Sequence, residues 1–189
     1  MKFTKRIITN QVLNQSDADF SEGEIILIDK PSGPTSFQVV SKIRKITGVK
    51  KVGHSGTLDP KASGLMIICT GKKTKEMDSF INLNKTYTGI IRLGLTSQSM
   101  DTETECTELP LPKDLDEKKI FEIRNSFLGE IEQIPPMYSA VKVDGKKLYN
   151  LARKGKTIVR EPRKILIEKF EIKKIDLPDI HFIITCSKG

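Results

Sequence analysis

The sequence predicts an α+β domain in which helices flank a mixed or largely antiparallel sheet. Strand-type apolar runs and helix-type apolar spacings follow one another along the chain, without the regular strand–helix–strand repetition of a parallel sheet. The length points to a single core, since 189 residues, of which 37% are hydrophobic, can bury one core well. We therefore expect one folded domain over residues 23–189.

The elements of the first half begin after a polar leader, residues 1–22. Residues 24–29 form the first strand-type run. Thr35 or Ser36 can cap a helix whose apolar residues recur at helical spacing and which ends at Gly48. A strand, a short helix and an alternating strand are then expected at residues 65–69, 73–80 and 87–93.

The second half contains one segment of doubtful order and three further elements. Residues 95–113 are rich in Thr, Ser and acidic residues, so we expect a mobile loop with little structure. Residues 116–127 form a second helix, stopped by Gly129, and a Pro-Pro pair at 135–136 marks a turn. A short helix and two closing strands complete the pattern: residues 148–152, 164–175 and 180–186.

Positive charge is concentrated in one stretch of the chain. The net charge is +8, and residues 138–174 hold 12 Lys and Arg against 4 Asp and Glu, while the remainder holds 20 of each sign. Tyr138 and Tyr149 lie among these charges, which combines cations for phosphates with rings that can stack on bases. This clustering favours a nucleic-acid surface, although a solvated basic face around two partly buried tyrosines would give the same pattern.

Several protein classes are excluded by composition. Cys69, Cys106 and Cys186 are widely separated and odd in number, which indicates neither a zinc site nor a disulfide framework. The only histidines, His54 and His181, have no partner at metal-ligand spacing. The first residues are too polar for a secretory signal, and no apolar run approaches the roughly 20 residues of a membrane span. We expect a cytoplasmic protein without a metal or a membrane partner.

The most informative segment is residues 53–65, Gly-His-Ser-Gly-Thr-Leu-Asp-Pro-Lys-Ala-Ser-Gly-Leu. Its three glycines and its proline constrain the backbone around a single carboxylate, Asp59. A carboxylate held on a rigid turn is a candidate nucleophile. The alternative is an ordinary turn in which Asp59 hydrogen-bonds its own backbone.

This segment closely resembles the central motif of the TruB family of tRNA pseudouridine synthases. Residues 29–36, Asp-Lys-Pro-Ser-Gly-Pro-Thr-Ser, resemble the family's first motif. Further matches follow in the family's order at residues 85–87, 133–142, 145–149 and 186–189. An ordered set of this kind is far more specific than one motif, and it covers the chain from about Glu24 to its end. The resemblance implies the pseudouridine synthase fold.

The resemblance also implies the reaction, which is isomerisation of uridine to pseudouridine at position 55 in the T loop of tRNA. Asp59 would be the nucleophile, attacking C1′ of the ribose or C6 of the base, or it would assist a glycal route; the sequence leaves these routes open. No cofactor is expected, because the reaction adds no atom and involves no net redox change. The target base must be flipped out of its stack to be reached. We expect a monomer acting on the T stem-loop.

Further residues take roles by the same resemblance. Tyr87 would pack against the flipped base, and His54 would occupy the space vacated by flipped nucleotides. Tyr138, Lys142 and Tyr149 would contact RNA, the last two from a flap that closes on the T arm. The remaining matches are expected to shape and brace the central motif: Lys30, Pro31, Gly56, Thr57, Leu58 and Pro60.

The end of the chain departs from the family pattern. In the family, Cys-Ser-Lys-Gly runs directly into Thr-Tyr-Ile-Arg, and this arginine pairs with the catalytic aspartate. The present chain ends at Gly189. We therefore expect a partial catalytic domain, truncated before the C-terminal part of its sheet and lacking the small C-terminal RNA-binding domain. Such a chain is expected to bind RNA weakly and to turn over slowly or not at all.

Two alternative functions compete with this interpretation. A non-catalytic RNA-binding module would need only the basic stretch, and Asp59 would be incidental. The related guide-RNA-directed synthase of archaea and eukaryotes shares the central motif but works inside a ribonucleoprotein. The stretches at 133–140 and 145–149 favour the stand-alone bacterial enzyme.

Overall fold

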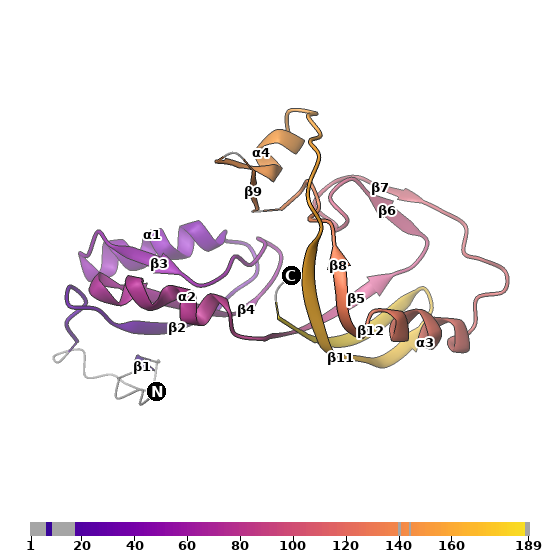
Figure 1. Cartoon of the computed structure of the whole chain (residues 1–189), viewed down its shortest axis with the longest axis horizontal. Coiled ribbons are helices and arrows are strands. Elements are labelled where there is room, and N and C mark those ends of the chain that lie inside the picture. Colours follow the sequence, from indigo (N-terminus) through magenta and orange to yellow (C-terminus); the bar gives the residue numbers. More distant parts are fainter. Residues whose placement is uncertain (1–6, 9–17, 140, 144, 188–189) are drawn as a thin grey trace. The chain divides into compact units, whose positions relative to one another are not determined.

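The chain divides into two compact units, Met1–Leu83 and Asn84–Gly189. A computed structural model describes residues 7–8, 18–139, 141–143 and 145–187 (Figure 1). Each unit has its own four-stranded sheet and its own hydrophobic cluster, where the sequence had predicted a single core. The α+β class is confirmed, but its strands pair only within their own unit.

The first unit is built on a mixed sheet with the strand order β1-β2-β4-β3. The β1–β2 pair is parallel and the other pairs are antiparallel. Its elements are, in order, β1 (Ile7–Ile8), β2 (Ile25–Lys30), α1 (Ser36–Thr47), β3 (Val52–His54), β4 (Gly64–Thr70), the 3₁₀ helix η2 (Gly71–Glu76) and α2 (Met77–Ile81).

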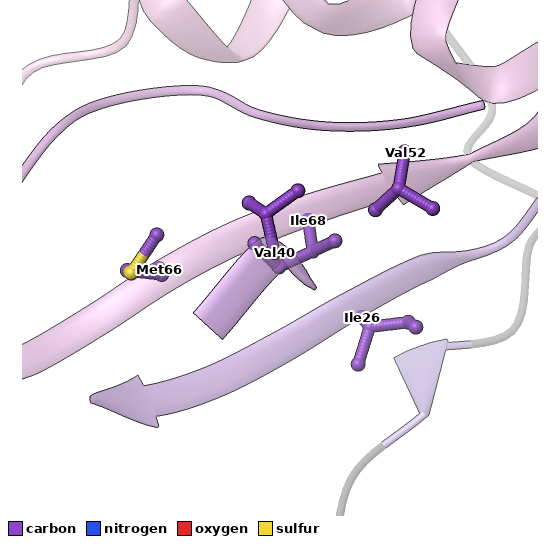
Figure 2. Packing of buried hydrophobic residues seen from close by; sticks show 5 residues of the cluster. All are labelled: Ile26, Val40, Val52, Met66 and Ile68. Atoms are coloured by element: carbon purple, nitrogen blue, oxygen red, sulfur yellow. The ribbon is translucent and has the colours of Figure 1, made fainter. Parts of the chain in front are cut away.

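Helix α1 follows the sequence signals closely. The Thr35 side chain accepts a hydrogen bond from the Gln38 N–H, and the Gln38 side chain accepts one from the Thr35 N–H, which forms a capping box. The helix ends where Gly48 adopts a left-handed conformation with φ 69°. Its apolar face joins a buried cluster with the sheet, shown in Figure 2: Ile26, Val40, Val52, Met66 and Ile68.

The second unit contains an antiparallel sheet with the order β5-β12-β11-β8. A buried cluster of Ile165, Ile167 and Cys186 lies on this sheet. The elements of the unit are, in order, β5 (Lys85–Arg92), β6 (Leu95–Ser97), β7 (Cys106–Glu108), α3 (Glu117–Ser126), β8 (Gly129–Gln133), β9 (Lys142–Val143), β10 (Lys146–Lys147), α4 (Leu148–Ala152), β11 (Arg163–Asp176) and β12 (Asp179–Cys186).

The prediction of an unstructured loop over residues 95–113 is wrong in its first part. Strands β6 and β7 pair as an antiparallel hairpin, with Thr96 opposite Thr107. Each strand has only three residues, so neither shows the alternating pattern by which a strand is recognised in sequence. Strand β3, also of three residues, and strand β8 were not predicted either.

The end of the predicted leader packs against η2. The Asp19 side chain accepts hydrogen bonds from the Ser21 and Glu22 N–H groups, and the Glu22 carbonyl accepts one from the Lys72 N–H. At Gly71 a Cβ atom would lie 2.1 Å from the Ser21 carbonyl oxygen, so only glycine allows this approach. Most earlier residues of the leader lie outside the described part of the chain.

The core of the first unit should be most sensitive at Ile68, whose side chain is 0% exposed. Replacing Ile68 by Ala should lower the free energy of unfolding by about 2–5 kcal/mol, because the change leaves a cavity. Urea denaturation followed by circular dichroism measures this loss. Leu65→Ala on the same strand is the matched control, since Leu65 is 63% exposed; an equal loss there would contradict the packing described.

The three thiols should differ in reactivity. Burial raises the pKa of the Cys69 and Cys186 thiols, while Cys106 is exposed. Because the thiolate is the reactive form, a thiol reagent at mildly alkaline pH should label Cys106 first, and the other two only in denaturant. Mass spectrometry of tryptic peptides checks the order. In Cys106→Ser the fast phase should disappear; rapid labelling of Cys69 would overturn the prediction.

Candidate active site

Asp59 lies in the loop between β3 and β4, residues 55–63, here called the motif loop. The residue is exposed, and its carbonyl accepts a hydrogen bond from the Ala62 N–H at 3.1 Å. Pro60 therefore occupies the first corner of a tight turn, where its fixed φ suits the geometry. The turn directly follows the carboxylate, so the backbone beside Asp59 is constrained.

Helix α1 holds the residue that precedes Asp59. The Ser36 hydroxyl donates to the Leu58 carbonyl at 2.8 Å and accepts from the Leu58 N–H at 2.9 Å. Ser36 is only 3% exposed, and Leu58 packs against the hydrophobic cluster of the first unit. Since Thr35 caps the helix, the neighbouring hydroxyl is left to bind the motif loop.

Lys30 connects the first and the central sequence motifs through hydrogen bonds of its buried side chain. Its side chain is 0% exposed, and its Nζ donates to the carbonyl oxygens of Pro31, Pro34 and Pro60 at 3.0, 2.9 and 3.2 Å. These acceptors come from two segments about 30 residues apart in sequence, which the fold brings together. The bond to Pro60 is the direct connection to the turn that follows Asp59.

Two further hydrogen bonds connect the same segments. The Gly33 N–H donates to the Pro60 carbonyl at 2.8 Å, and the Ser32 hydroxyl donates to the Lys61 carbonyl at 3.0 Å. The Pro60 oxygen thus accepts from both Gly33 and Lys30. Residues 30–34 and 60–61 are therefore connected by backbone and side-chain hydrogen bonds together.

His54 braces the other end of the motif loop. It ends β3 opposite Ile68, and its Nδ1 lies 2.5 Å from the Gly56 carbonyl oxygen. Because a carbonyl only accepts, Nδ1 is the donor in this contact. The half-buried ring thus fixes the loop three residues before Asp59.

The three glycines of the segment differ in their roles. Gly64 has φ +126°, and a Cβ on Gly53 would lie 2.6 Å from the Met77 methyl carbon. At Gly56, by contrast, a Cβ would meet nothing within 4 Å and φ is not positive. The expected need for glycine is thus met by the backbone at Gly64, whereas at Gly53 only the flexible end of Met77 lies in the way and at Gly56 only the carbonyl is used. Thr57 is exposed.

The remaining predicted site residues belong to the second unit, and their approach to Asp59 stays a prediction. Tyr87 on β5 is opposite Ile184 and is half-buried against the Ile165, Ile167 and Cys186 cluster. Tyr138 is half-buried in the turn after β8. The Lys142 side chain and residues 188–189 of the last motif lie outside the described part of the chain.

Tyr149 is placed by a small module of α4 and the β9–β10 hairpin. Its N–H donates to the Ser139 carbonyl at 3.1 Å, and the Leu148 N–H donates to the Val141 carbonyl at 2.8 Å. The Arg153 guanidinium lies 5.4 Å from the centre of the Tyr149 ring, a cation–π contact. The structure therefore brings Ser139 and Val141 to the start of α4 and stacks a cation on Tyr149.

Sequence reasoning missed the roles of Ser32 and Ser36 in holding the motif loop. Both residues lie in the first motif, but a serine near a helix start is first read as a cap. In the ranges that the structure covers, no three His, Cys, Asp or Glu side chains gather as a metal site would require. No helix in those ranges is both long and apolar enough to cross a membrane.

Curated relatives share extended similarity with the chain. It is 52% identical over 173 residues to tRNA pseudouridine synthase B of Chlorobaculum tepidum, covering 89% of this chain and 72% of the relative. For the synthase of Flavobacterium johnsoniae the identity is 45% over 178 residues, with coverages of 90% and 78%. For that of Clostridium tetani the identity is 47% over 165 residues, with coverages of 87% and 57%.

Solved structures give a consistent result. A Cbf5–Nop10–Gar1 complex contains a chain that matches with a TM-score of 0.64 and 30% identity, covering 90% of this chain and 41% of that one. An H/ACA ribonucleoprotein bound to a substrate RNA matches with a TM-score of 0.60 and 26% identity.

A family profile gives the assignment. The profile described as the N-terminal domain of TruB family pseudouridylate synthases matches residues 44–189, which include the motif loop and the whole second unit. Together with identities of 45–52% to relatives of which the chain covers more than two thirds, this match establishes that the chain belongs to the TruB family of pseudouridylate synthases.

Proposed function

We propose that this protein isomerises uridine to pseudouridine in tRNA, with Asp59 as the nucleophile. The observation that carries the proposal is the support of the motif loop, in which Lys30 and Ser36 hold the residues on both sides of Asp59. An exposed carboxylate on a braced loop is the arrangement that covalent catalysis by an aspartate requires.

The chemistry agrees with the composition of this site. The C1′–N1 bond breaks, the base turns, and C1′ joins C5, so no atom is added and no electron leaves the substrate. An ionised carboxylate suffices, either as nucleophile at C1′ or C6 or as the group that assists a glycal route. Lys30 donates to the Pro60 carbonyl, so it constrains the backbone next to this carboxylate.

We further propose that the substrate is the T stem-loop of tRNA and that the position modified is uridine 55. The relatives at 45–52% identity are named for tRNA, and this supports the choice of RNA. Flipping the target base would give Asp59 access to the glycosidic bond, with Tyr87 packing on the base and His54 beside the vacated space. Tyr138, Lys142 and Tyr149 would contact the RNA. The protein would act as a cytoplasmic monomer.

The likeness to a chain of an H/ACA ribonucleoprotein supports the guide-dependent synthase as the second candidate function. That alternative predicts no product on free tRNA unless a guide RNA and partner proteins are added. The identities of 26–30% to the chains of the solved structures are well below those to the tRNA enzymes, which favours the stand-alone reaction.

Asp59→Asn should abolish pseudouridine formation in an unmodified tRNA, lowering the rate by roughly 10³-fold or more, because the amide is no nucleophile. Tritium release from C5-labelled uridine measures the reaction without guide RNA, and filter binding measures tRNA affinity, which should be retained. Asp78→Asn, at an exposed aspartate of the same unit, is the control. Product formation by Asp59→Asn at the wild-type rate would refute Asp59 as the nucleophile, whereas tRNA binding by the wild type without any product would favour the RNA-binding interpretation.

Lys30→Met should lower both stability and turnover. Removing the ammonium leaves the Pro31 and Pro34 carbonyls without this donor and frees the turn after Asp59, at a cost of about 1–3 kcal/mol in unfolding free energy. Thermal denaturation and kcat are the measurements, and kcat should fall at temperatures where the variant is fully folded. Lys72→Met removes an exposed lysine and should change neither; unchanged kcat in Lys30→Met would contradict the bracing role.

A further inference from the structure

A second candidate binding feature lies away from the motif loop, at the C-terminal end of α1. A hollow of about 400 Å³ opens there, between the last turn of the helix and the turn that follows it. We call it the basic hollow, and its lining residues are Ser41, Arg44, Lys45, Gly48, Val49 and Lys50. All of them belong to the first unit, which also carries Asp59.

Positive charge in the basic hollow is unopposed. The chain has no Asp or Glu between Asp29 and Asp59, while this segment holds six Lys and Arg residues. Three of the six line the basic hollow, and none of the three forms an ion pair within the described ranges. The net charge outside residues 138–174 is zero, because acidic residues elsewhere offset the positive charges of this cluster.

The helix dipole does not cancel this charge. The C-terminal end of a helix carries about −0.5 elementary charge, and basic residues in the last turn commonly offset it. Here Arg44, Lys45 and Lys50 supply three full positive charges at that end. The remaining potential is that of roughly two and a half positive charges, so the basic hollow favours an anion.

Hydrogen-bond donors in the basic hollow are in place and unused. The Arg44 Nη2 donates to the Val52 carbonyl at 2.9 Å, which fixes the guanidinium in the lining of the basic hollow. Within the described part of the chain, the Ser41 hydroxyl and the Lys50 N–H make no hydrogen bond. Guanidinium, ammonium, hydroxyl and backbone N–H are the groups that bind phosphate oxygens.

We propose that the basic hollow binds a backbone phosphate of the RNA on which the Asp59 loop acts, an inference that rests on the proposed function. Helix α1 has 12 residues and is therefore about 18 Å long. Its first residue, Ser36, is hydrogen-bonded to Leu58, next to Asp59. The helix thus sets a fixed spacing between the carboxylate and a phosphate several nucleotides from the reacting base.

The test is the salt dependence of tRNA binding by the double variant Lys45→Gln/Lys50→Gln, which keeps Arg44 and its bond to Val52. Each lost phosphate contact should reduce the slope of log K against log salt concentration by about 1. We expect the slope to fall by about 1 and the affinity at low salt to fall on the order of tenfold. Lys45→Arg/Lys50→Arg should restore both quantities.

The matched control is Lys72→Gln/Lys118→Gln. It removes two exposed lysines that lie outside the basic hollow and outside residues 138–174. Equal losses in the two double variants would show a general charge effect and overturn the proposal. Phosphate ethylation interference adds a positional readout. Ethylation of one phosphate should weaken binding of the wild type but not of Lys45→Gln/Lys50→Gln. Identical interference patterns would also overturn the proposal.

Two outcomes distinguish a failure of the phosphate-site proposal from a failure of the proposed function. If wild type binds no tRNA, the proposed function fails, and the basic hollow loses its ligand with it. If wild type binds and modifies tRNA but Lys45→Gln/Lys50→Gln matches it in affinity and slope, only the basic hollow fails. Shifts of the Lys50 amide resonance by inorganic phosphate, with unchanged tRNA binding in the variant, would reveal a site for free anions and refute the RNA contact.

Discussion

The burial of the Lys30 ammonium among three backbone carbonyls is the interaction on which the candidate site depends. A buried cation is usually paired with a carboxylate, which neutralises it. Here neutral dipoles from Pro31, Pro34 and Pro60 take the place of its hydration shell. Two of these carbonyls belong to the first motif and the third belongs to the turn after Asp59. One buried side chain thus holds the two segments together.

Helix α1 is hydrogen-bonded at both of its ends to the segment that carries the motif loop. At one end Ser36 binds both polar groups of the Leu58 backbone. At the other end Arg44 donates to the Val52 carbonyl, at the start of the strand that leads into the motif loop. The helix is therefore bonded to the chain on both sides of His54, at Val52 in β3 and at Leu58 in the motif loop. Its position follows the helix, which itself packs through Val40 on the sheet.

Much of the fold could be predicted from sequence where local signals are strong. The α1 helix has a capping box and a left-handed glycine, and the long strands β11 and β12 show clear apolar patterns. The short strand β3 was missed because its three residues are held only by pairing with β4, a contact that local pattern does not encode. The division into two units was missed for the same reason, since which strands pair is a property of the whole chain.

The sequence identified the main residues of the candidate site, but it did not predict which atoms those residues contact. Asp59 and Lys30 were identified from motifs, but the three carbonyl partners of Lys30 emerge only when residues 30–34 and 60–61 meet in space. Thr35 and Ser36 looked equivalent as caps, and only the structure separates the cap from the brace. The charges at Arg44, Lys45 and Lys50 escaped notice because a net count averages over the chain.

The hydrogen bond from His54 to the Gly56 carbonyl differs in range from the other bonds that hold the motif loop. His54 and Gly56 are two residues apart, so this contact needs no other segment of the chain. The bonds from Ser36 to Leu58 and from Lys30 to Pro60, by contrast, join residues that are 22 and 30 positions apart. One end of the motif loop is therefore held locally and the other by long-range contacts. A local opening that separates Lys30 and Ser36 from the motif loop would free the turn after Asp59 and leave the His54 contact in place.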